Sequence, residues 1–361
     1  MTIGQNNNAF GKRFLKNKGA LFALILIGIA FLLAIFGYVI APDNSTNANR
    51  MIPEVGSKKP GFTMQLLMLQ KEQNAASENT FVQLFVGKKD LFTYTPITSY
   101  QLIGRDSIVY EKFVDDSITE KKSVKLSTSS IYKVNKQTFY LGTDKFGRDI
   151  LSRLIIGVRV SLGVGLIAVL ISITIGIFLG SLAGYFRGWV DDVIMWFINV
   201  IWSIPTLLLV FAITLVLGKG FWQVFIAVGL TMWVNVARLV RGQVLAVREL
   251  EYIEATKALG YSHTRTILKH ILPNILGPVM VIAASNFASA IVIEAGLSFL
   301  GVGVQPPQPS WGLMIKENYN FIITNNPMLA LVPGIAIMLL VLAFNLLGNG
   351  LRDALNVRGK F

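Results

Sequence analysis

Six long stretches of this chain carry almost no charge, and they constrain its fold more than any other feature. Several exceed the ~18 consecutive apolar residues that indicate a membrane-spanning segment. In lipid, each segment must satisfy its own backbone N–H and C=O groups, so every stretch is predicted to be an α-helix. The predicted spans are residues 20–41, 161–184, 192–217, 221–240, 276–297 and 328–348. We therefore predict an all-α polytopic membrane protein with six transmembrane helices.

The composition agrees with a membrane protein and excludes several kinds of site. Only 15% of the 361 residues are charged, whereas soluble chains carry about 25%. The chain has no cysteine, which excludes disulfides, thiolate metal sites and cysteine nucleophiles. Its two histidines, His263 and His270, are too few for a histidine-rich metal site, so no cofactor is expected in this chain. The net charge of +13 suits basic residues that flank membrane spans, and no nucleic-acid partner is expected.

The first apolar run is longer than a secretory signal. Four cations, Lys12, Arg13, Lys16 and Lys18, precede the run from Leu21 to Ala41, and a signal peptide has an apolar core of only ~7–15 residues. We therefore predict a retained first span.

Basic residues near the span ends predict the orientation, because they accumulate on the cytoplasmic side. They occur in the first 20 residues, in the loop between the fourth and fifth spans, and in the tail, which holds Arg352, Arg358 and Lys360. Six spans bring all three segments to one side, so both termini are expected in the cytoplasm. Four cations before the second span oppose this pattern: Lys145, Arg148, Arg153 and Arg159. Asp144 and Asp149 are expected to offset part of their charge.

Residues 42–141 interrupt the apolar pattern as a polar insertion of about 100 residues. Residues 42–60 are predicted to be a loop. From Thr80 onward the pattern favours short strands, at residues 81–86, 108–110, 124–126 and 131–134, with turns at Gly87, Asp106 and Asp115–Asp116. The predicted organisation is a first span in 1–41, a small β-rich domain outside the cytoplasm in 42–141, and a transmembrane domain in 142–361.

Small and polar residues occur within the spans. Gly176, Gly180 and Gly184 recur every four residues, a spacing that allows two helix backbones to approach closely. Pro205 is expected to kink or break the third span. The candidate pathway-lining residues are Asn199, Trp202, Ser203, Asn286 and Glu294. The alternative for the polar side chains is hydrogen bonding between helices, and Glu294 suits an interfacial position as well as a buried one.

The loop between the fourth and fifth spans, residues 245–273, has the pattern of a helix–turn–helix. Apolar residues recur at helical spacing on both sides of Gly260, which suits the left-handed conformation at a helix end. Ser262 can cap a second helix, and Pro273 is expected to mark its end or a bend into the fifth span. We call these residues the bracket, and we expect a rigid element that a partner can push.

The bracket resembles the EAA loop of binding-protein-dependent ABC importer permeases. The matching positions are Glu254, Ala255, Gly260, Leu272 and Pro273, whereas Thr256 replaces the second alanine of the pattern. Residues 142–162 and 294–312 resemble two further segments of the C-type permease of dipeptide and oligopeptide importers. The resemblance covers roughly three quarters of the chain and omits the insertion at 42–141.

The resemblance implies a subunit that forms part of a peptide pathway in the bacterial cytoplasmic (inner) membrane. It also implies a heterodimer with a second permease, two cytoplasmic ATPase subunits that bind ATP, and an external solute-binding protein. In this reading the five matching bracket residues dock the ATPase. The chain has no Gly-x-x-x-x-Gly-Lys-Ser/Thr loop that would cradle phosphates, which agrees with a transport subunit rather than an enzyme.

Two other classes remain as alternatives. An ion channel or ion-coupled secondary transporter would need no ATPase, but such proteins commonly carry ionisable residues near mid-membrane and inverted repeats. A membrane enzyme is less favoured, because Glu294 has no histidine or second carboxylate near it in the spans.

Overall fold

The computed structural model describes residues 11, 13–71, 80–103, 107–125, 132–323 and 326–355. They belong to two compact units. The first comprises Met1–Ala30, Ser161–Gln305 and Ala336–Phe361, and the second comprises Phe31–Val160 and Pro306–Ile335. Each unit is described by itself below.

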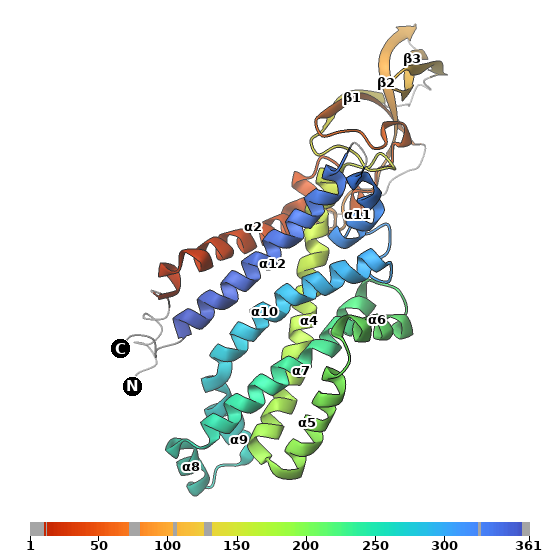
Figure 1. Cartoon of the computed structure of the whole chain (residues 1–361). Helices are drawn as coiled ribbons and strands as arrows, with labels where there is room; N and C mark the ends of the chain where they lie inside the picture. Colours follow the sequence, from red (N-terminus) through yellow and green to blue (C-terminus); the bar gives the residue numbers. More distant parts are fainter. Residues whose placement is uncertain are drawn as a thin grey trace. The chain divides into compact units, whose positions relative to one another are not determined.

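Among the described residues, five helical stretches are long and apolar enough to cross a membrane (Figure 1). They are α2 (Lys18–Ile40), α4 (Ile150–Phe186), α7 (Phe221–Arg248), the stretch His263–Leu300, and α12 (Met328–Leu355). A pair of helices, α5 (Gly188–Trp202) and α6 (Thr206–Leu217), passes the same test together but is bent by 91°. The chain is therefore a multi-pass membrane protein, and its described residues contain five candidate spans, or six if the bent pair counts as one.

The bend falls where the sequence predicted a break. Pro205 has no N–H to donate, and its ring disfavours a helical conformation at the preceding residue. The backbone instead turns through Ser203 and Ile204, whose N–H groups donate to Asn199 (3.0 Å) and Ile201 (3.2 Å). α6 then begins directly after Pro205.

The three glycines spaced by four residues lie in α4 against α7, as their spacing predicted. A Cβ on Gly180 would lie 2.5 Å from the carbonyl oxygen of Ala237 and 2.8 Å from Cβ of Val240. Gly176 and Gly184 meet α7 at similarly short distances. Only glycine allows this close approach of the two helix backbones.

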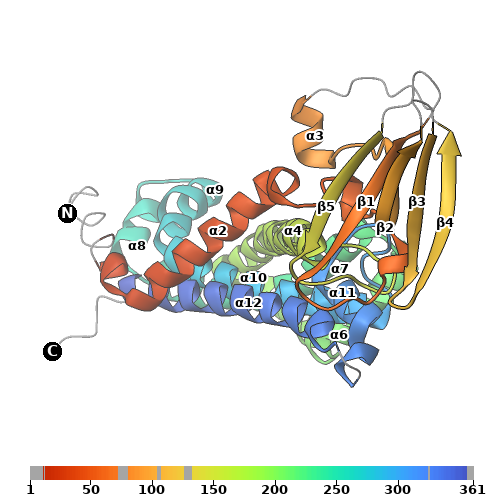
Figure 2. The same cartoon turned by 90° about the horizontal axis from the view of Figure 1, so that it is seen from above.

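The insertion forms a five-stranded antiparallel sheet with strand order β4-β3-β2-β1-β5 (Figure 2). The strands are β1 (Phe62–Gln70), β2 (Phe92–Ile103), β3 (Ser107–Asp115), β4 (Ile118–Lys125) and β5 (Tyr132–Phe139). Leu66 and Leu67 in β1, which lies between β2 and β5, point to opposite faces, and each joins a separate buried apolar cluster. The sequence predicted the β character of this region but missed β1 and β2 entirely.

Most of the remaining expectations for the insertion are confirmed. Residues 42–60 form a loop with two short 3₁₀ turns, η1 (Thr46–Ala48) and η2 (Pro53–Val55). The turn at Asp115–Asp116 joins β3 to β4. Asp106, Leu126 and Ile131, which belonged to a predicted turn and two strand ends, lie outside the described residues.

The strand predicted over residues 81–86 is wrong. These residues form the helix α3 (Thr80–Val86), which ends at Gly87 in the left-handed conformation, with φ +85°. The apolar and β-branched residues favoured a strand by local propensity. Arg159 from α4 instead donates to the last carbonyl groups of α3, at Leu84 (2.9 Å) and Phe85 (2.7 Å), and so supports a helix end.

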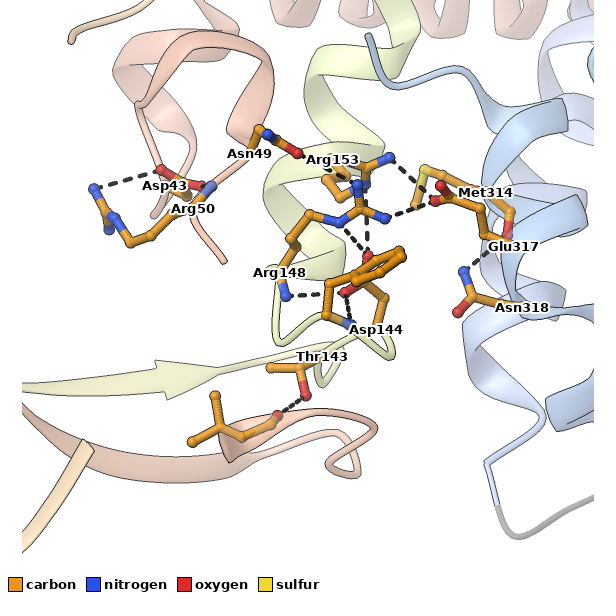
Figure 3. Close-up of polar contacts among 12 residues, drawn as sticks. Asp43, Asn49, Arg50, Thr143, Asp144, Arg148, Arg153, Met314, Glu317 and Asn318 are labelled. Atoms are coloured by element: carbon orange, nitrogen blue, oxygen red, sulfur yellow. Dashed lines mark hydrogen bonds and ion pairs between the residues drawn. The ribbon is translucent and has the colours of Figure 1, made fainter. Parts of the chain in front are cut away.

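A buried ionic cluster organises the turn that precedes α4 (Figure 3). Arg148 donates from Nε to Asp144 (2.6 Å) and from Nη2 to Glu317 (2.7 Å) on α11 (Trp311–Asn318). Arg153 lies 3.4 Å from the same Glu317 carboxylate. The side chains of Asp144, Arg148 and Arg153 are at most 2% exposed. The predicted offset of these cations by Asp144 is thus confirmed, and Glu317 supplies the second carboxylate.

Asp149 does not share in this pairing, contrary to the expected charge offset. Its carboxylate accepts hydrogen bonds from both the N–H (2.8 Å) and the hydroxyl of Ser152 at the start of α4. Burial raises the pKa of Asp149, and the Ser152 hydrogen bonds oppose that rise. Gly147 shapes the same turn with φ +73°, since a Cβ there would lie 1.8 Å from the carbonyl oxygen of Ile52.

Candidate functional site

The first arm of the bracket is the short helix α8 (Glu251–Ala258), which lies beyond the end of α7 (Figure 1). Ile253 is fully buried and Thr256 is 6% exposed. The Thr256 hydroxyl donates to the carbonyl of Ile253 (2.7 Å), so its polar group is satisfied within the helix. At 100° per residue, the opposite face presents the exposed residues Glu251, Glu254, Ala255 and Ala258.

Gly260 ends α8, as predicted. Its φ of +73° lies in the left-handed region. The N–H of Gly260 donates to Lys257 (2.9 Å), and the N–H of Tyr261 donates to Thr256 (3.0 Å). This pair of bonds is the Schellman motif, which satisfies carbonyl groups that a helix end leaves open.

The second arm starts at Ser262, whose hydroxyl accepts a hydrogen bond from the N–H of Arg265 (3.4 Å). This confirms the predicted cap. α9 (His263–Thr266) then continues through a π-helical turn, η3 (Ile267–Ile271), into α10 (Leu272–Leu300).

Pro273 was expected to mark the end of the second arm or a bend into the fifth span, and the arm does not end there. Proline lacks the N–H that would donate one turn back. The N–H of Leu272 reaches Ile267 five residues back, so the π turn widens the helix immediately before the proline. The helical stretch therefore runs on from His263 to Leu300.

The buried side of the bracket is part of the core of the helical unit. Ile253 and Ile271 pack in one apolar cluster with Tyr185 of α4, Val244 of α7 and Ile275 of α10. All five side chains are at most 4% exposed. A displacement of the bracket must therefore move the ends of α4, α7 and α10 with it.

Polar contacts tie the bracket to the same helices. The Tyr185 hydroxyl lies 2.9 Å from Nδ1 of His263, and Arg248 at the end of α7 donates to the carbonyl of Tyr185. Arg187 and Glu249 pair at 2.5 Å on the surface, and the hydrogen bond from Arg187 lowers the pKa of Glu249.

The five predicted docking residues fall into two groups. Glu254, Ala255 and Gly260 are exposed on α8 and its terminal turn. Leu272 is half-buried against the apolar cluster, and Pro273 is exposed on the first turn of α10. The first three thus share a surface, whereas Leu272 has a structural role.

Sequence reasoning missed Leu259, which is 72% exposed at the tip of the bracket. It stands directly before the glycine cap, where the helix turns away from the core and leaves the side chain without neighbours to pack against. An apolar residue beside a predicted helix end was the signal that could have identified this position.

A cavity of about 480 Å³ opens in the same unit, between the α5–α6 break, α7, α10 and α12. Its wall combines apolar side chains with hydroxyl and amide groups. The polar lining residues are Thr206, Thr231, Asn235, Ser289 and Asn345. Asn235, Ser289 and Asn345 are exposed although they lie on helices that cross the membrane, so the cavity provides a polar surface at membrane depth.

Of the five candidate pathway residues, only Trp202 lines this cavity among the described residues. It lies under the guanidinium of Arg238, 3.6 Å from the ring centroid, and Asn199 accepts from the same guanidinium (3.0 Å). The Ser203 hydroxyl donates to the carbonyl of Val200 (2.7 Å) and stabilises the break in the span.

The other two candidates are buried. Asn286 is 4% exposed and lies 3.5 Å from the hydroxyl of Ser172 on α4, the contact between helices that was the alternative interpretation. Glu294 is fully buried, which decides against an interfacial position. It accepts from Ser298 (2.7 Å), whose hydroxyl in turn accepts from the N–H of Val304.

Comparison with known proteins places similarity in two parts of the chain. Residues 176–359 match the family described as binding-protein-dependent transport system inner membrane component. Residues 9–60 match the N-terminal transmembrane domain of oligopeptide transport permease C.

Three curated relatives are similar over most of their own length. The glutathione transport system permease protein GsiD of Pectobacterium atrosepticum is 42% identical, over 61% of this chain and 73% of that protein. The dipeptide transport system permease protein DppC of Alkalihalophilus pseudofirmus is 43% identical, over 61% and 72%. The oligopeptide transport system permease protein OppC of Bacillus subtilis is 37% identical, over 64% and 76%.

Proposed function

Because the chain belongs to the family of binding-protein-dependent transport system inner membrane components, and is thus a permease of an ATP-driven importer, we propose that it imports peptides and receives its driving motion through the bracket. The bracket would couple the chain to separate ATPase subunits. The names of its relatives support the substrate class, since they transport dipeptides, oligopeptides and glutathione.

The observation that carries this proposal is the two-sided construction of α8. One face is buried with α4, α7 and α10, while the other exposes two alanines and two glutamates. Small side chains allow a partner surface to approach the helix closely, and the carboxylates complement basic groups on that surface. We propose that Glu254, Ala255 and Gly260 form the docking surface, together with Glu251, Ala258 and Leu259. Leu272 and Pro273 support it by fixing the second arm.

The proposed mechanism is alternating access. ATP bound by the partner subunits closes them together, and the bracket moves as one body because its turn is fixed by hydrogen bonds and its core is packed. The spans then open the pathway toward the outside, and hydrolysis resets them. The cavity with Trp202, Asn235, Ser289 and Asn345 would form this chain's share of the pathway, and Asn199 would hold Trp202 in place through Arg238.

The family supports the expected set of partners. We propose a second, homologous permease as heterodimer partner, two cytoplasmic ATPase subunits, and a solute-binding protein outside the membrane. In this arrangement both termini and the bracket lie in the cytoplasm, and the insertion lies on the opposite side. The bilayer surrounds the spans, and no nucleic acid takes part.

The test is to purify the tagged permease with its partners in mild detergent and to quantify the ATPase subunits that accompany it. Glu254→Lys should reduce their recovery about tenfold or more, the change that corresponds to ~1.4 kcal/mol of docking free energy. Asp192→Lys is the matched control, because Asp192 is another exposed carboxylate that lies on the first turns of α5 and not on α8. The second permease should be recovered equally with both variants.

Equal recovery of ATPase subunits with Glu254→Lys and Asp192→Lys would contradict docking through α8. If peptide uptake by intact cells continued after the partner ATPase was disabled, the chain would work as a channel or ion-coupled transporter instead.

A further inference from the structure

The short helix α3 presents an apolar surface that the sheet does not cover. It lies beside the sheet and not on its face (Figure 2). The exposed fractions of Phe81, Val82, Phe85 and Val86 are 70%, 45%, 50% and 49%. Their spacing of i, i+1, i+4 and i+5 places all four on one side of the helix. A seven-residue helix is marginal in water by itself, so a patch of this kind requires an environment that favours it.

One guanidinium holds α3 against the C-terminal part of α2. Arg159 donates to Phe85 (2.7 Å) and Leu84 (2.9 Å) of α3. It also donates to Ala34 (2.6 Å) and Ile35 (3.1 Å) of α2. The guanidinium satisfies carbonyl groups at the C-terminal end of α3 that would otherwise be unpaired. It also holds this end of α3 beside Ala34 and Ile35 of α2.

The level of Ala34 and Ile35 along α2 lies inside the membrane. α2 has 23 residues, which span about 35 Å, whereas the hydrocarbon core is about 30 Å thick. Ile35 precedes the end of α2 at Ile40 by five residues, or about 8 Å along the helix. With α2 upright and centred, the C-terminal end of α3 is therefore about 5 Å inside the hydrocarbon boundary, the depth at which interfacial helices lie.

The surface of α3 continues that of α2. Val39 and Ile40, the last residues of α2, are 70% and 53% exposed. A hollow of about 620 Å³ lies between the two helices, with Val39, Phe81 and Leu84 in its wall and one cation, Lys88. A phospholipid fits both features, because its acyl chains match the apolar wall and its phosphate matches the lysine.

We propose that α3 is an interfacial membrane helix whose apolar face lies among phospholipid acyl chains and anchors the insertion to the bilayer at the C-terminal end of α2. The chain leaves α3 at Gly87 and returns to the sheet. Only glycine fits at this position, because a Cβ would lie 2.8 Å from the ring of Tyr38. The anchor holds the sheet close to the membrane surface. This inference does not depend on the transported substrate or on the ATPase docking.

The chain has no cysteine, so single thiols can test the surroundings of α3 in the full-length permease in lipid nanodiscs. Val82→Cys and Phe85→Cys probe α3. Leu32→Cys, at an exposed position eight residues before the end of α2, is the lipid reference, and Ser123→Cys is the water reference on exposed β4. With a hydrophilic maleimide, both α3 thiols should react nearly as slowly as Leu32→Cys and about tenfold or more below the Ser123→Cys rate, because only the thiolate reacts and lipid disfavours it.

Nitroxide labels on the same thiols separate lipid from protein surroundings. In lipid, the labels are accessible to dissolved oxygen and inaccessible to a water-soluble nickel complex, and this is the expected result for α3. Labels on α3 that are shielded from both reagents would be buried in protein, which overturns the proposal. Reaction of the α3 thiols at the Ser123→Cys rate also overturns it. The same holds if the thiols become protected only when the solute-binding protein is added, because the patch would then bind that protein and not lipid.

Discussion

Replacing Gly180 by alanine should destabilise the packing of α4 against α7. The added Cβ would lie 2.5 Å from the carbonyl oxygen of Ala237 and 2.8 Å from Cβ of Val240. The carbonyl oxygen belongs to a helix backbone and cannot rotate away, so the two helices must separate. Overpacking of this kind costs about 1–3 kcal/mol, and alanine recovers up to ~1 kcal/mol because it favours a helix more than glycine does.

Gly242→Ala is the matched control, because Gly242 lies in α7 and no described atom comes within 4 Å of its added Cβ. Both variants gain the same helix propensity, so their difference isolates the overpacking cost of about 1–3 kcal/mol. At roughly 2 °C per kcal/mol for a chain of this size, the midpoints should differ by about 2–6 °C.

The assay is thermal inactivation of the folded protein in mild detergent. A fluorescently tagged permease is heated, and the fraction that still elutes as a single peak is measured at one fixed heating rate, since unfolding is irreversible. Gly180→Ala should show the lower midpoint. A midpoint for Gly180→Ala equal to or above that of Gly242→Ala would refute the reasoning from backbone contact.

Three further predictions concern charge and the cavity. Arg148→Met should cost roughly 3 kcal/mol, because it leaves the carboxylate of Asp144 buried without its nearest cation; limited proteolysis of the insertion should accelerate, and Asp144→Asn in the same chain should restore part of the resistance. Glu249→Gln should lower the thermal midpoint at pH 7 only slightly, since the pair with Arg187 is exposed; the lowered pKa of Glu249 means that this contribution is complete above pH 4.5 and is lost as the pH falls through the lowered value, so the difference between wild type and the variant should disappear there. Asn235→Leu should reduce uptake of a labelled dipeptide while ATPase recovery stays at the wild-type level, and unchanged uptake would remove Asn235 from the pathway.

The membrane helices and the bracket were predictable because their determinants are local. Lipid requires an apolar run to satisfy its own backbone, so hydropathy alone locates the spans. Pro205 and Gly260 act through φ and a missing N–H, which depend on the residue and not on its partners. The break in the third span and the turn of the bracket therefore lie where the sequence predicts them.

The elements that sequence reasoning missed depend on distant partners. Residues 81–86 favour a strand locally, but they form a helix whose last carbonyl groups accept hydrogen bonds from Arg159, more than seventy residues later in the chain. The cations before the predicted second span opposed the rule that places basic residues in the cytoplasm. Arg148 and Arg153 face the carboxylate of Glu317, and Arg159 is occupied by carbonyl groups. The orientation rule counts basic residues near the span ends and takes no account of these long-range pairings.

The cavity likewise depends on helix packing, because its polar residues are far apart in the sequence. Asn235 and Asn345 are amides on helices that cross the membrane, and nothing local distinguishes them from amides that bond between helices. Asn286 shows that second outcome at Ser172. Which amide meets an open space is decided only when α7, α10 and α12 come together.

In the proposed mechanism, the connection between the bracket and the cavity runs through α7. Val244 packs with Ile253 of the bracket in the apolar cluster, and Asn235 lines the cavity nine residues earlier in the same helix, about 14 Å along its axis. No proline or helix break interrupts α7 between these positions, so a push on the bracket reaches the cavity without loss. The backbone that can absorb the motion is the 91° break between α5 and α6, and Trp202 and Ile204 of this break form part of the cavity wall. A rigid displacement of α7 toward this break would change the shape of the cavity and leave the core intact, which is what alternating access requires of a subunit driven from outside.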